Sequence, residues 1–429
     1  MSWKPRGSKR TRSLNRSASG AHRFCIDIPH VNARAKEYTV SSPAPLQGLR
    51  VLDLTQLLPG PVATLRLAEL GADVLKIEPP GAGDATRVMM QSAADEVAGR
   101  PGALYRIVNR GKRETRIDLK SDSGRTVLLA LARHADVLVE GFRPGVMERL
   151  GVGYDTLHDA NPKLVYCSIS GYGADGPFAS RPGHDLNYIA YAGVLDQLST
   201  RDGVPVLPNF EIADLLGGAL SAVTQILAAL WQVARGGDGR FVGVSIAHAT
   251  YAHNVIAQVA IANDDANANR PGQGLLNGGA PCYHLYRTKD GRWLAVAALE
   301  LKFWETLCTA LGRDDWATRH WSLGQAIGGA DAAALTNELA SLIAQEPLQV
   351  WIDRLELLDC CVSPVLTPEE ASRHPMFNPQ ALAGNADAAI DSPNQDDPGH
   401  QDSPDRSQAN PAESPFQRPA RPFDYGSWD

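Results

Sequence analysis

The sequence offers little that would support a secreted, metal-binding or nucleic-acid-binding protein. Its six cysteines in 429 residues include an adjacent pair, Cys360 and Cys361, and none has the spacing of a metal site. Reduced thiols in the cytoplasm are therefore expected rather than a disulfide framework. The formal net charge of −7 gives no support to nucleic acid as a partner.

An apolar run that clearly spans a membrane is also missing. The nearest candidate is Leu215–Ala234, which is apolar overall but contains two glycines and several Ser, Thr and Gln residues. We expect a buried core helix there and no membrane partner.

The first 44 residues lack the apolar core of a secretory signal and are rich in Arg, Lys and Ser. Three interpretations stay open: an organellar transit peptide, a disordered basic extension, and a start codon assigned too early. The basic extension that stays disordered is the one we favour.

From Pro45 onward, strand-like and helix-like patterns alternate along the chain. Pro59-Gly60-Pro61 opens a helical pattern that ends at Gly71, as expected for Pro in the first turn and Gly just past the last one. Strands separated by helices of about ten residues predict βαβ units and a mostly parallel sheet, which is the α/β class. The predicted strands are Leu49–Leu54, Ala72–Glu78, Glu114–Leu119, Ala135–Gly141 and Leu164–Ser170.

A second region follows the long apolar helix. Tyr283–Leu299 has the pattern of a β-hairpin with Asp290-Gly291 at its turn, and helical patterns follow at Phe303–Leu311 and Ala332–Ala344. We therefore predict a large α/β domain over 45–245, a linker with a smaller α+β domain over 246–360, and a return segment over 361–429. Within the last segment, 378–418 is rich in Asn, Asp, Pro, Ser and Gln and is expected to be a disordered insertion.

The stretch Arg181–Tyr188, RPGHDLNY, carries the clearest chemical signal. It follows the predicted strand LVYCSIS, and loops beyond the carboxyl ends of parallel strands are where α/β folds place ligands. His184 and Asp185 are neighbours in it. By itself such a pair is more often structural than catalytic.

The chain resembles the family III CoA-transferase and α-methylacyl-CoA racemase superfamily from Pro45 to Phe377. The resemblance implies a Rossmann-like large domain, a smaller α+β domain, an interlocked homodimer and a CoA thioester as substrate, with no permanently bound cofactor. It rests on the collinear segments LQGLRVLDLTQLLPGP, LGADVLKIEPPGAGD, RGKRETRIDLKSDSGR, ADVLVEGFRPGVMERLG, GYGADGP, GHDLNY, ADLLGGAL and GGAPCYHLYRTKDGRWLAVAALE.

The resemblance also separates two reactions. In the transferase branch an aspartate of this loop, here Asp185, forms a mixed anhydride with the acyl group. In the racemase branch the loop His and an aspartate near the start of the following helix are the two bases. His184 and Asp214 match the racemase pattern.

Two bases on opposite faces of the α-carbon can remove a proton and return it to the other side. An imidazole suits one face, and a carboxylate suits the other if burial raises its pKa. By the resemblance, the Asp185 backbone N–H and the adjoining loop are the candidate donors to the enolate oxygen. The competing interpretation of Asp214 is a helix N-cap.

Further site residues are carried over from the resemblance. Glu300 matches a glutamate that hydrogen-bonds the catalytic His from the partner subunit's small domain; the alternative is an ordinary surface glutamate. The phosphates of CoA require Arg and Lys. The candidate CoA-binding residues are Gln56, Arg110, Lys120, Arg143, Arg149 and Tyr188. Arg110 and Arg143 come from basic clusters in the sequence, whereas the resemblance favours Lys120 and Arg149 and puts Gln56 near the pantetheine.

The sequence therefore predicts an α-methylacyl-CoA racemase that acts through an enolate. The first alternative is a CoA-transferase that uses Asp185, and the weakest is a non-catalytic acyl-CoA-binding protein. The sequence departs from the family at FVGVSIAHAT, where Gly243 and His248 stand in a region that often carries an Asp-bearing VDV.

Overall fold

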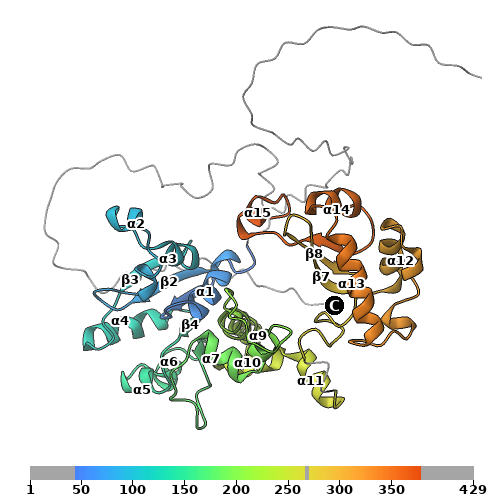
Figure 1. The fold of residues 1–429 in the computed structure, drawn as a ribbon. Helices are drawn as coiled ribbons and strands as arrows, with labels where there is room; N and C mark the ends of the chain where they lie inside the picture. Colours follow the sequence, from blue (N-terminus) through green and yellow to red (C-terminus); the bar gives the residue numbers. More distant parts are fainter. Residues whose placement is uncertain (1–43, 266–269, 378–429) are drawn as a thin grey trace, which may run out of the picture. The chain divides into compact units, whose positions relative to one another are not determined.

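The computed structural model describes residues 44–265 and 270–377 (Figure 1). Residues 1–43 of the predicted extension over 1–44, and all of the predicted insertion over 378–418, lie outside the described residues. The large-sheet part (residues 44–265) and the small-sheet part (residues 270–377) are treated separately below.

The large-sheet part is built on a six-stranded sheet of order β3-β2-β1-β4-β5-β6, in which every pairing is parallel. The strands are β1 Arg50–Asp53, β2 Asp73–Glu78, β3 Arg113–Arg116, β4 Val137–Glu140, β5 Val165–Ser170 and β6 Phe241–Ser245. The first five were predicted and are confirmed. The sixth was not predicted, and it occupies the FVGVS stretch that departs from the family pattern.

The strand order defines a switch point between β1 and β4. From β1 the chain proceeds to β2 and β3 on one side, and later to β4, β5 and β6 on the other. Ligands bind in such sheets outside the carboxyl ends of the strands at this point. A ligand site is therefore expected at the carboxyl ends of the strands, next to this switch point.

Successive residues of a strand point to opposite faces of the sheet, and the sheet has a separate apolar core on each face. Val51 of β1 packs with α1 (Pro59–Glu69) and α9 (Ser221–Ala234), whereas Leu52 packs with α4 (Asp122–Ala132) and α6 (Tyr154–Ala160). The sheet is thus covered on both sides. The other helical elements are η1 Ala85–Arg87, α2 Ala93–Val97, α3 Ala103–Val108, α5 Val146–Arg149, α7 Asp185–Tyr191, α8 Val194–Gln197, η2 Ala213–Leu220, α10 Ile246–His253 and α11 Val255–Ala262.

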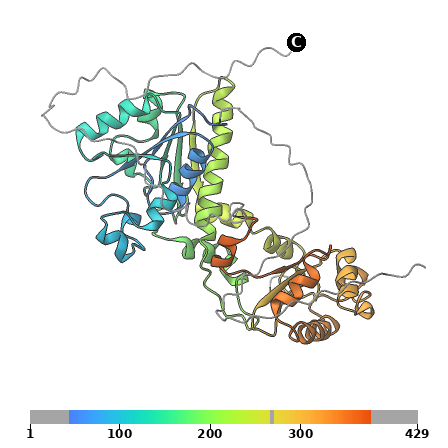
Figure 2. The same cartoon turned by 90° about the horizontal axis from the view of Figure 1, so that it is seen from above.

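The elements η2 and α9 form one long helix, which Figure 2 shows beside the sheet. Within the described residues it is the one helix long and apolar enough to cross a membrane by length and composition. It packs against α1, β5, β6 and α10. That packing agrees with the predicted core helix.

The small-sheet part has an antiparallel sheet of order β7-β8-β9, with β7 Tyr283–Arg287, β8 Trp293–Ala297 and β9 Val362–Pro364. The predicted hairpin is confirmed, and Gly291 adopts the left-handed φ of 78° that its turn requires. Its helical elements are α12 Leu301–Ala310, η3 Asp314–Trp316, η4 Trp321–Leu323, α13 Ala330–Ile343 and α14 Leu348–Leu355. They pack around a core that contains buried tryptophans.

The predicted boundary at residue 360 is too early. Val362–Pro364 pairs with β8, and Arg292 of the hairpin forms an ion pair of 2.7 Å with Glu370 in α15 (Pro368–Arg373). The small-sheet part therefore continues at least into α15, because hydrogen bonds and charge hold these residues to the hairpin.

Candidate active site

Asp214 lies in the first turn of the long helix, in the π-helical segment η2. The N-cap residue of that segment is Ile212, so the helix has already begun before Asp214 and Asp214 is not its cap. Gly217 lets α10 approach this turn, because a Cβ there would come within 2.3 Å of Thr250 Oγ1. Short π-helical segments are frequent at functional sites.

Asp185 is joined directly to Asp214. The Asp214 backbone N–H donates a hydrogen bond of 2.8 Å to Asp185 Oδ1, which fixes the start of α7 against the start of η2. Burial raises the pKa of Asp185, although the backbone N–H groups of Asp214 and Ala213 oppose this shift. Its carboxylate is therefore already engaged by a helix start.

The Asp214 carboxyl has the properties of a base that works near neutral pH. Burial, followed by the carboxylates of Asp185 and Glu211, raises the pKa of Asp214 from 3.8 to about 7. Glu211 lies one turn earlier, since the Leu215 N–H donates 3.0 Å to the Glu211 carbonyl. Three carboxylates thus share one site, and the pKa of about 7 belongs to Asp214.

His184 is exposed at the N-cap position of α7, next to Asp185. Its backbone N–H donates 3.1 Å to Asn187 Oδ1, and the loop before it is fixed by the Tyr188 hydroxyl, which donates 2.6 Å to the Gly183 carbonyl. The loop is close-packed, because a Cβ on Gly183 would come within 2.8 Å of Tyr172 Oη. The imidazole therefore projects from a rigid turn.

Asp185 is the first residue of α7, so its N–H lies in the first turn, where a helix provides no acceptor of its own. That placement suits the predicted donor to an enolate oxygen. Tyr188, predicted as a ligand contact, is buried with its hydroxyl committed to Gly183. Its placement suits support of the loop better than binding of CoA.

Glu300 belongs to the small-sheet part, where it is the exposed N-cap residue of α12. Its own side chain makes no cap hydrogen bond. Cys361 lies beside it, and after burial the Glu300 carboxylate is the largest influence that raises the pKa of the Cys361 thiol. Glu300 is thus an exposed carboxylate on a fixed helix start.

Four predicted CoA-binding residues follow the carboxyl ends of strands. Gln56 follows β1, Lys120 follows β3, and Arg143 follows β4. Arg149, at the end of α5, folds back over the same turn, with Nη1 3.1 Å from where a Cβ on Gly145 would lie. These residues share the sheet edge that holds the switch point.

Arg110 does not belong with them. It precedes β3, so it lies toward the opposite edge of the parallel sheet, and its guanidinium is paired with Glu69 at the end of α1. The prediction that Arg110 binds CoA together with the other basic residues is therefore not supported by its position.

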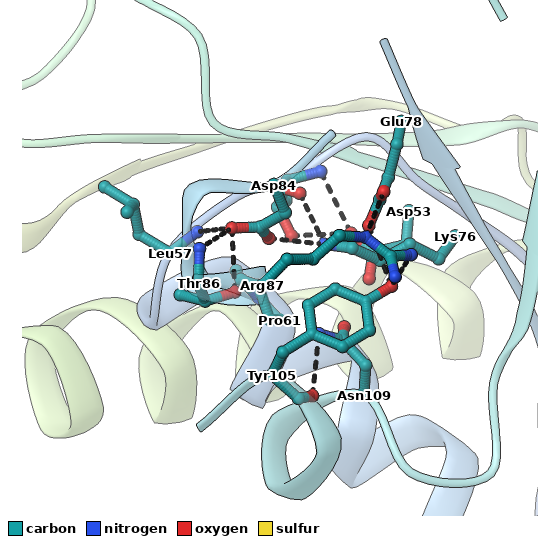
Figure 3. A network of polar contacts seen from close by, with 12 residues as sticks. Asp53, Leu57, Pro61, Lys76, Glu78, Asp84, Thr86, Arg87, Tyr105 and Asn109 are labelled. Atoms are coloured by element: carbon teal, nitrogen blue, oxygen red, sulfur yellow. Dashed lines mark hydrogen bonds and ion pairs between the residues drawn. The ribbon is translucent and has the colours of Figure 1, made fainter. Parts of the chain in front are cut away.

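The loop that carries Gln56 rests on a buried network of charges, drawn in Figure 3. Lys76 and Asp84 are fully buried and 3.0 Å apart. Behind them Asp53 forms an ion pair of 3.0 Å with Lys112. Against the effect of burial, Lys112 and then Lys76 lower the pKa of Asp53 to about 2.

Sequence reasoning missed two carboxylates near this edge. Glu211 could have been found as an acidic residue three positions before Asp214 in a helical pattern. Glu140 ends β4, and burial raises its pKa to about 7 while it accepts 2.7 Å from the Phe142 N–H. No sequence signal marks Glu140, because its burial depends on the fold.

The fold and the site together define a class of protein. Its members are doubly wound α/β proteins with basic residues near the switch point and a carboxyl whose pKa lies near 7. The CoA-transferase family III model matches residues 46–419. The chain belongs to CoA-transferase family III, as the sequence resemblance predicted.

Relatives within the family carry out different reactions. The chain is 34% identical over 332 residues to alpha-methylacyl-CoA racemase of Homo sapiens, covering 77% of this chain and 80% of that protein. It is 35% identical to a probable fatty acyl-CoA transferase of Mycobacterium tuberculosis, covering 74% and 81%. The crystal structure of a CAIB/BAIF family protein from Brucella suis aligns with a TM-score of 0.66 and 28% identity, covering 80% and 89%.

Proposed function

We propose that this protein is an α-methylacyl-CoA racemase in which His184 and Asp214 are the two bases. The observation that carries the proposal is Asp214: burial and nearby carboxylates raise the pKa of its carboxyl to about 7, and its backbone N–H ties it to the segment of His184 through the hydrogen bond to Asp185. A base poised near the working pH is most effective in both of its protonation states. The match to alpha-methylacyl-CoA racemase of Homo sapiens supports the same choice.

The reaction needs no outside reagent. One base takes the proton from the α-carbon, and the electron pair of the broken C–H bond moves into the thioester to give an enolate. The opposite base, already protonated, then donates its proton to the other face. Each turnover leaves the two bases with their protonation states exchanged, and a carboxyl with a pKa of about 7 is suited to both roles.

The CoA part of the substrate is assigned to the carboxyl edge of the large sheet. Lys120, Arg143 and Arg149 supply cationic groups for the phosphates, and the partly exposed Gln56 lies over the switch point between β1 and β4. The proposed position of the pantetheine is then beside the loop of β1.

A second candidate, CoA transfer through Asp185, is favoured by the match to a probable fatty acyl-CoA transferase. Asp185 would attack the acyl carbon of the thioester, and CoA thiolate would leave a mixed anhydride behind. The thiolate would then attack the Asp185 carbonyl, which releases the donor acid and leaves CoA on Asp185 as a thioester. The acceptor carboxylate would attack this thioester to form a second anhydride, and the released thiolate would take the acceptor acyl group and free Asp185. Against it stands the engagement of Asp185 Oδ1 by the Asp214 N–H.

We further propose that the working form is a homodimer in which Glu300 of one copy meets His184 of the other. Glu300 is exposed and free of a cap hydrogen bond, so its carboxylate is available to an imidazole. Within the described residues, α11 presents Val255, Ile256, Val259 and Ile261 at half exposure or more, an apolar surface suited to a second copy. The cytoplasm is the proposed compartment, in keeping with free cysteines in the described residues.

The deciding experiment is incubation with (R)-2-methylacyl-CoA in deuterium oxide. Incorporation of deuterium at the α-carbon together with loss of optical purity is the expected result. Acyl exchange with an added carboxylate, without deuterium incorporation, would instead establish the transferase.

A further inference from the structure

The backbone on both sides of Gln56 is held by the two members of one buried ion pair. Lys76 Nζ donates 2.7 Å to the Thr55 carbonyl, and the Leu57 N–H donates 3.2 Å to Asp84 Oδ1. Lys76 and Asp84 are themselves joined at 3.0 Å, with neither side chain exposed to solvent. Figure 3 shows Leu57 and Lys76 meeting at Asp84.

This arrangement does more than hold the fold together. A buried ion pair is weak evidence for stability, because the cost of removing both charges from water offsets their attraction. Here each of the two charged side chains also forms a hydrogen bond with the backbone of residues 55–57. Asp84 Oδ1 also accepts from the Thr86 N–H at 3.0 Å and from Thr86 Oγ1 at 2.8 Å, so the carboxylate cannot swing away.

The turn that is held is also strained. Leu57 has a φ of +65°, a conformation that residues with a Cβ rarely adopt. Such strain persists only where the surroundings over-determine it, and it gathers at functional sites. Between the two fixed points, the Gln56 side chain is partly exposed, and no hydrogen bond to it is found within the described part of the chain.

We propose that the Lys76–Asp84 ion pair is a positioning device that holds the Gln56 amide in place for the thioester of the bound substrate. Lys76 and Asp84 are positioning residues, since they touch Gln56's backbone neighbours and not the substrate. The proposal rests on the proposed function, in which the pantetheine that carries the thioester lies beside the loop of β1. The amide N–H2 then has its place before the substrate arrives, and no ordering is needed during the reaction.

A double-mutant cycle tests this. Gln56→Ala should lower kcat/KM about tenfold or more by removing one hydrogen-bond donor, and Lys76→Met should lower it to a similar degree. In the Gln56→Ala background, Lys76→Met should cost less than about twofold, because there is no longer an amide to place. Lys76→Gln, which keeps a donor for the Thr55 carbonyl, should recover part of the loss.

The matched control is Tyr105→Phe. Tyr105 is almost as buried as Lys76, and its hydroxyl donates 2.8 Å to Glu78 of the same strand, but within the described residues no hydrogen bond joins this hydroxyl to residues 55–57. Tyr105→Phe should change kcat/KM by the same factor in the wild-type and the Gln56→Ala backgrounds. If Lys76→Met does not fold, Lys76→Gln takes its place in the cycle, with thermal unfolding measured for every variant.

Equal losses from Lys76→Met, or from Lys76→Gln in its place, in the two backgrounds would show that the ion pair only stabilises the fold. A Gln56→Ala variant with full activity would overturn the proposal as well. The wild type is assayed first for α-deuterium incorporation. If it transfers CoA without incorporation, the racemase proposal fails, and the same cycle is then measured on the transfer rate.

Discussion

The Asp185 carboxylate accepts a hydrogen bond of 2.8 Å from the backbone N–H of Asp214. Through this contact the loop that presents His184 and the helix that presents Asp214 are fixed to each other. It also brings a second negative charge to Asp214, which with burial raises the pKa of Asp214 to about 7. The same aspartate that could act as a nucleophile thus helps to make its neighbour a base.

Replacing either base should abolish racemisation while leaving part of the exchange chemistry. Asp214→Asn and His184→Ala should each lower racemisation by about 10²–10⁴-fold, the usual contribution of a general base. Each variant should still wash out the α-proton of one enantiomer, and the two variants should differ in which one. Deuterium incorporation into separate (R) and (S) substrates measures this. An Asp214→Asn enzyme that racemises at the wild-type rate would exclude the two-base mechanism.

Glu211 should set the pH at which Asp214 becomes a base. Its carboxylate is one of the charges that raise the pKa of Asp214. Exchange that depends on unprotonated Asp214 should rise with pH and level off above about 7 in the wild type. In Glu211→Gln this rise should occur at lower pH, because one opposing charge is gone. The pH profile of α-deuterium exchange for single enantiomers checks this, and an unmoved profile would show that Glu211 has no such effect.

The raised pKa of Asp214 also predicts a cost in stability. In the unfolded chain this carboxyl loses its proton near 3.8, whereas in the folded protein it does so near 7. Between these values the folded state binds more protons, so the free energy of unfolding falls as pH rises, and the loss is complete above about 7. Asp214→Asn should therefore raise the melting temperature at pH 8 and leave it nearly unchanged at pH 4. Equal shifts at the two pH values would contradict the assignment.

Arg149 and Arg110 give a direct test of where CoA binds. Arg149→Ala should raise KM for acyl-CoA about tenfold or more through loss of a charge-assisted hydrogen bond to phosphate. Arg110→Ala should change KM by less than about twofold, because its partner is Glu69 and not the ligand. The KM of each variant, measured at two salt concentrations, shows which of the two arginines contacts the phosphates of CoA. A larger effect from Arg110→Ala would restore its predicted role.

The sequence predicted most of the architecture because the determining signals are local. The apolar strands, the Asp290-Gly291 turn and the helix after Pro59 each depend on a few neighbouring residues. β6 was missed, since a glycine stands at the centre of its five residues and weakens the strand pattern. The spacing that puts Glu211 one helical turn before Asp214 is also local. The raised pKa of Asp214, however, depends on Asp185 as well, which only the fold brings next to Asp214.

Lys76 shows a different limit. In the sequence it is one charged residue inside the strand pattern ADVLKIE, which normally indicates an exposed position. Its burial is explained only by Asp84, eight residues later in a loop of glycine and proline, and by the Thr55 carbonyl. Likewise the predicted role of Arg110 followed from its charge and its proximity in sequence to other basic residues. The end of the strands at which Arg110 lies is set by the sheet topology. Partners of buried charges are a tertiary property.

The shared active site can be tested by mixing two inactive subunits. His184→Ala and Glu300→Gln homodimers should each be impaired, because one lacks the base and the other its hydrogen-bonding carboxylate. If Glu300 acts on the His184 of the other copy, a mixed dimer has one site with both defects and one intact site. Random mixing should then restore about one quarter of wild-type activity, since half the dimers are mixed and half their sites are intact. The measurement is racemisation after the two variants are unfolded and refolded together, with each variant refolded alone as the control. If both residues act within one subunit, every site keeps one defect, and no activity returns on mixing.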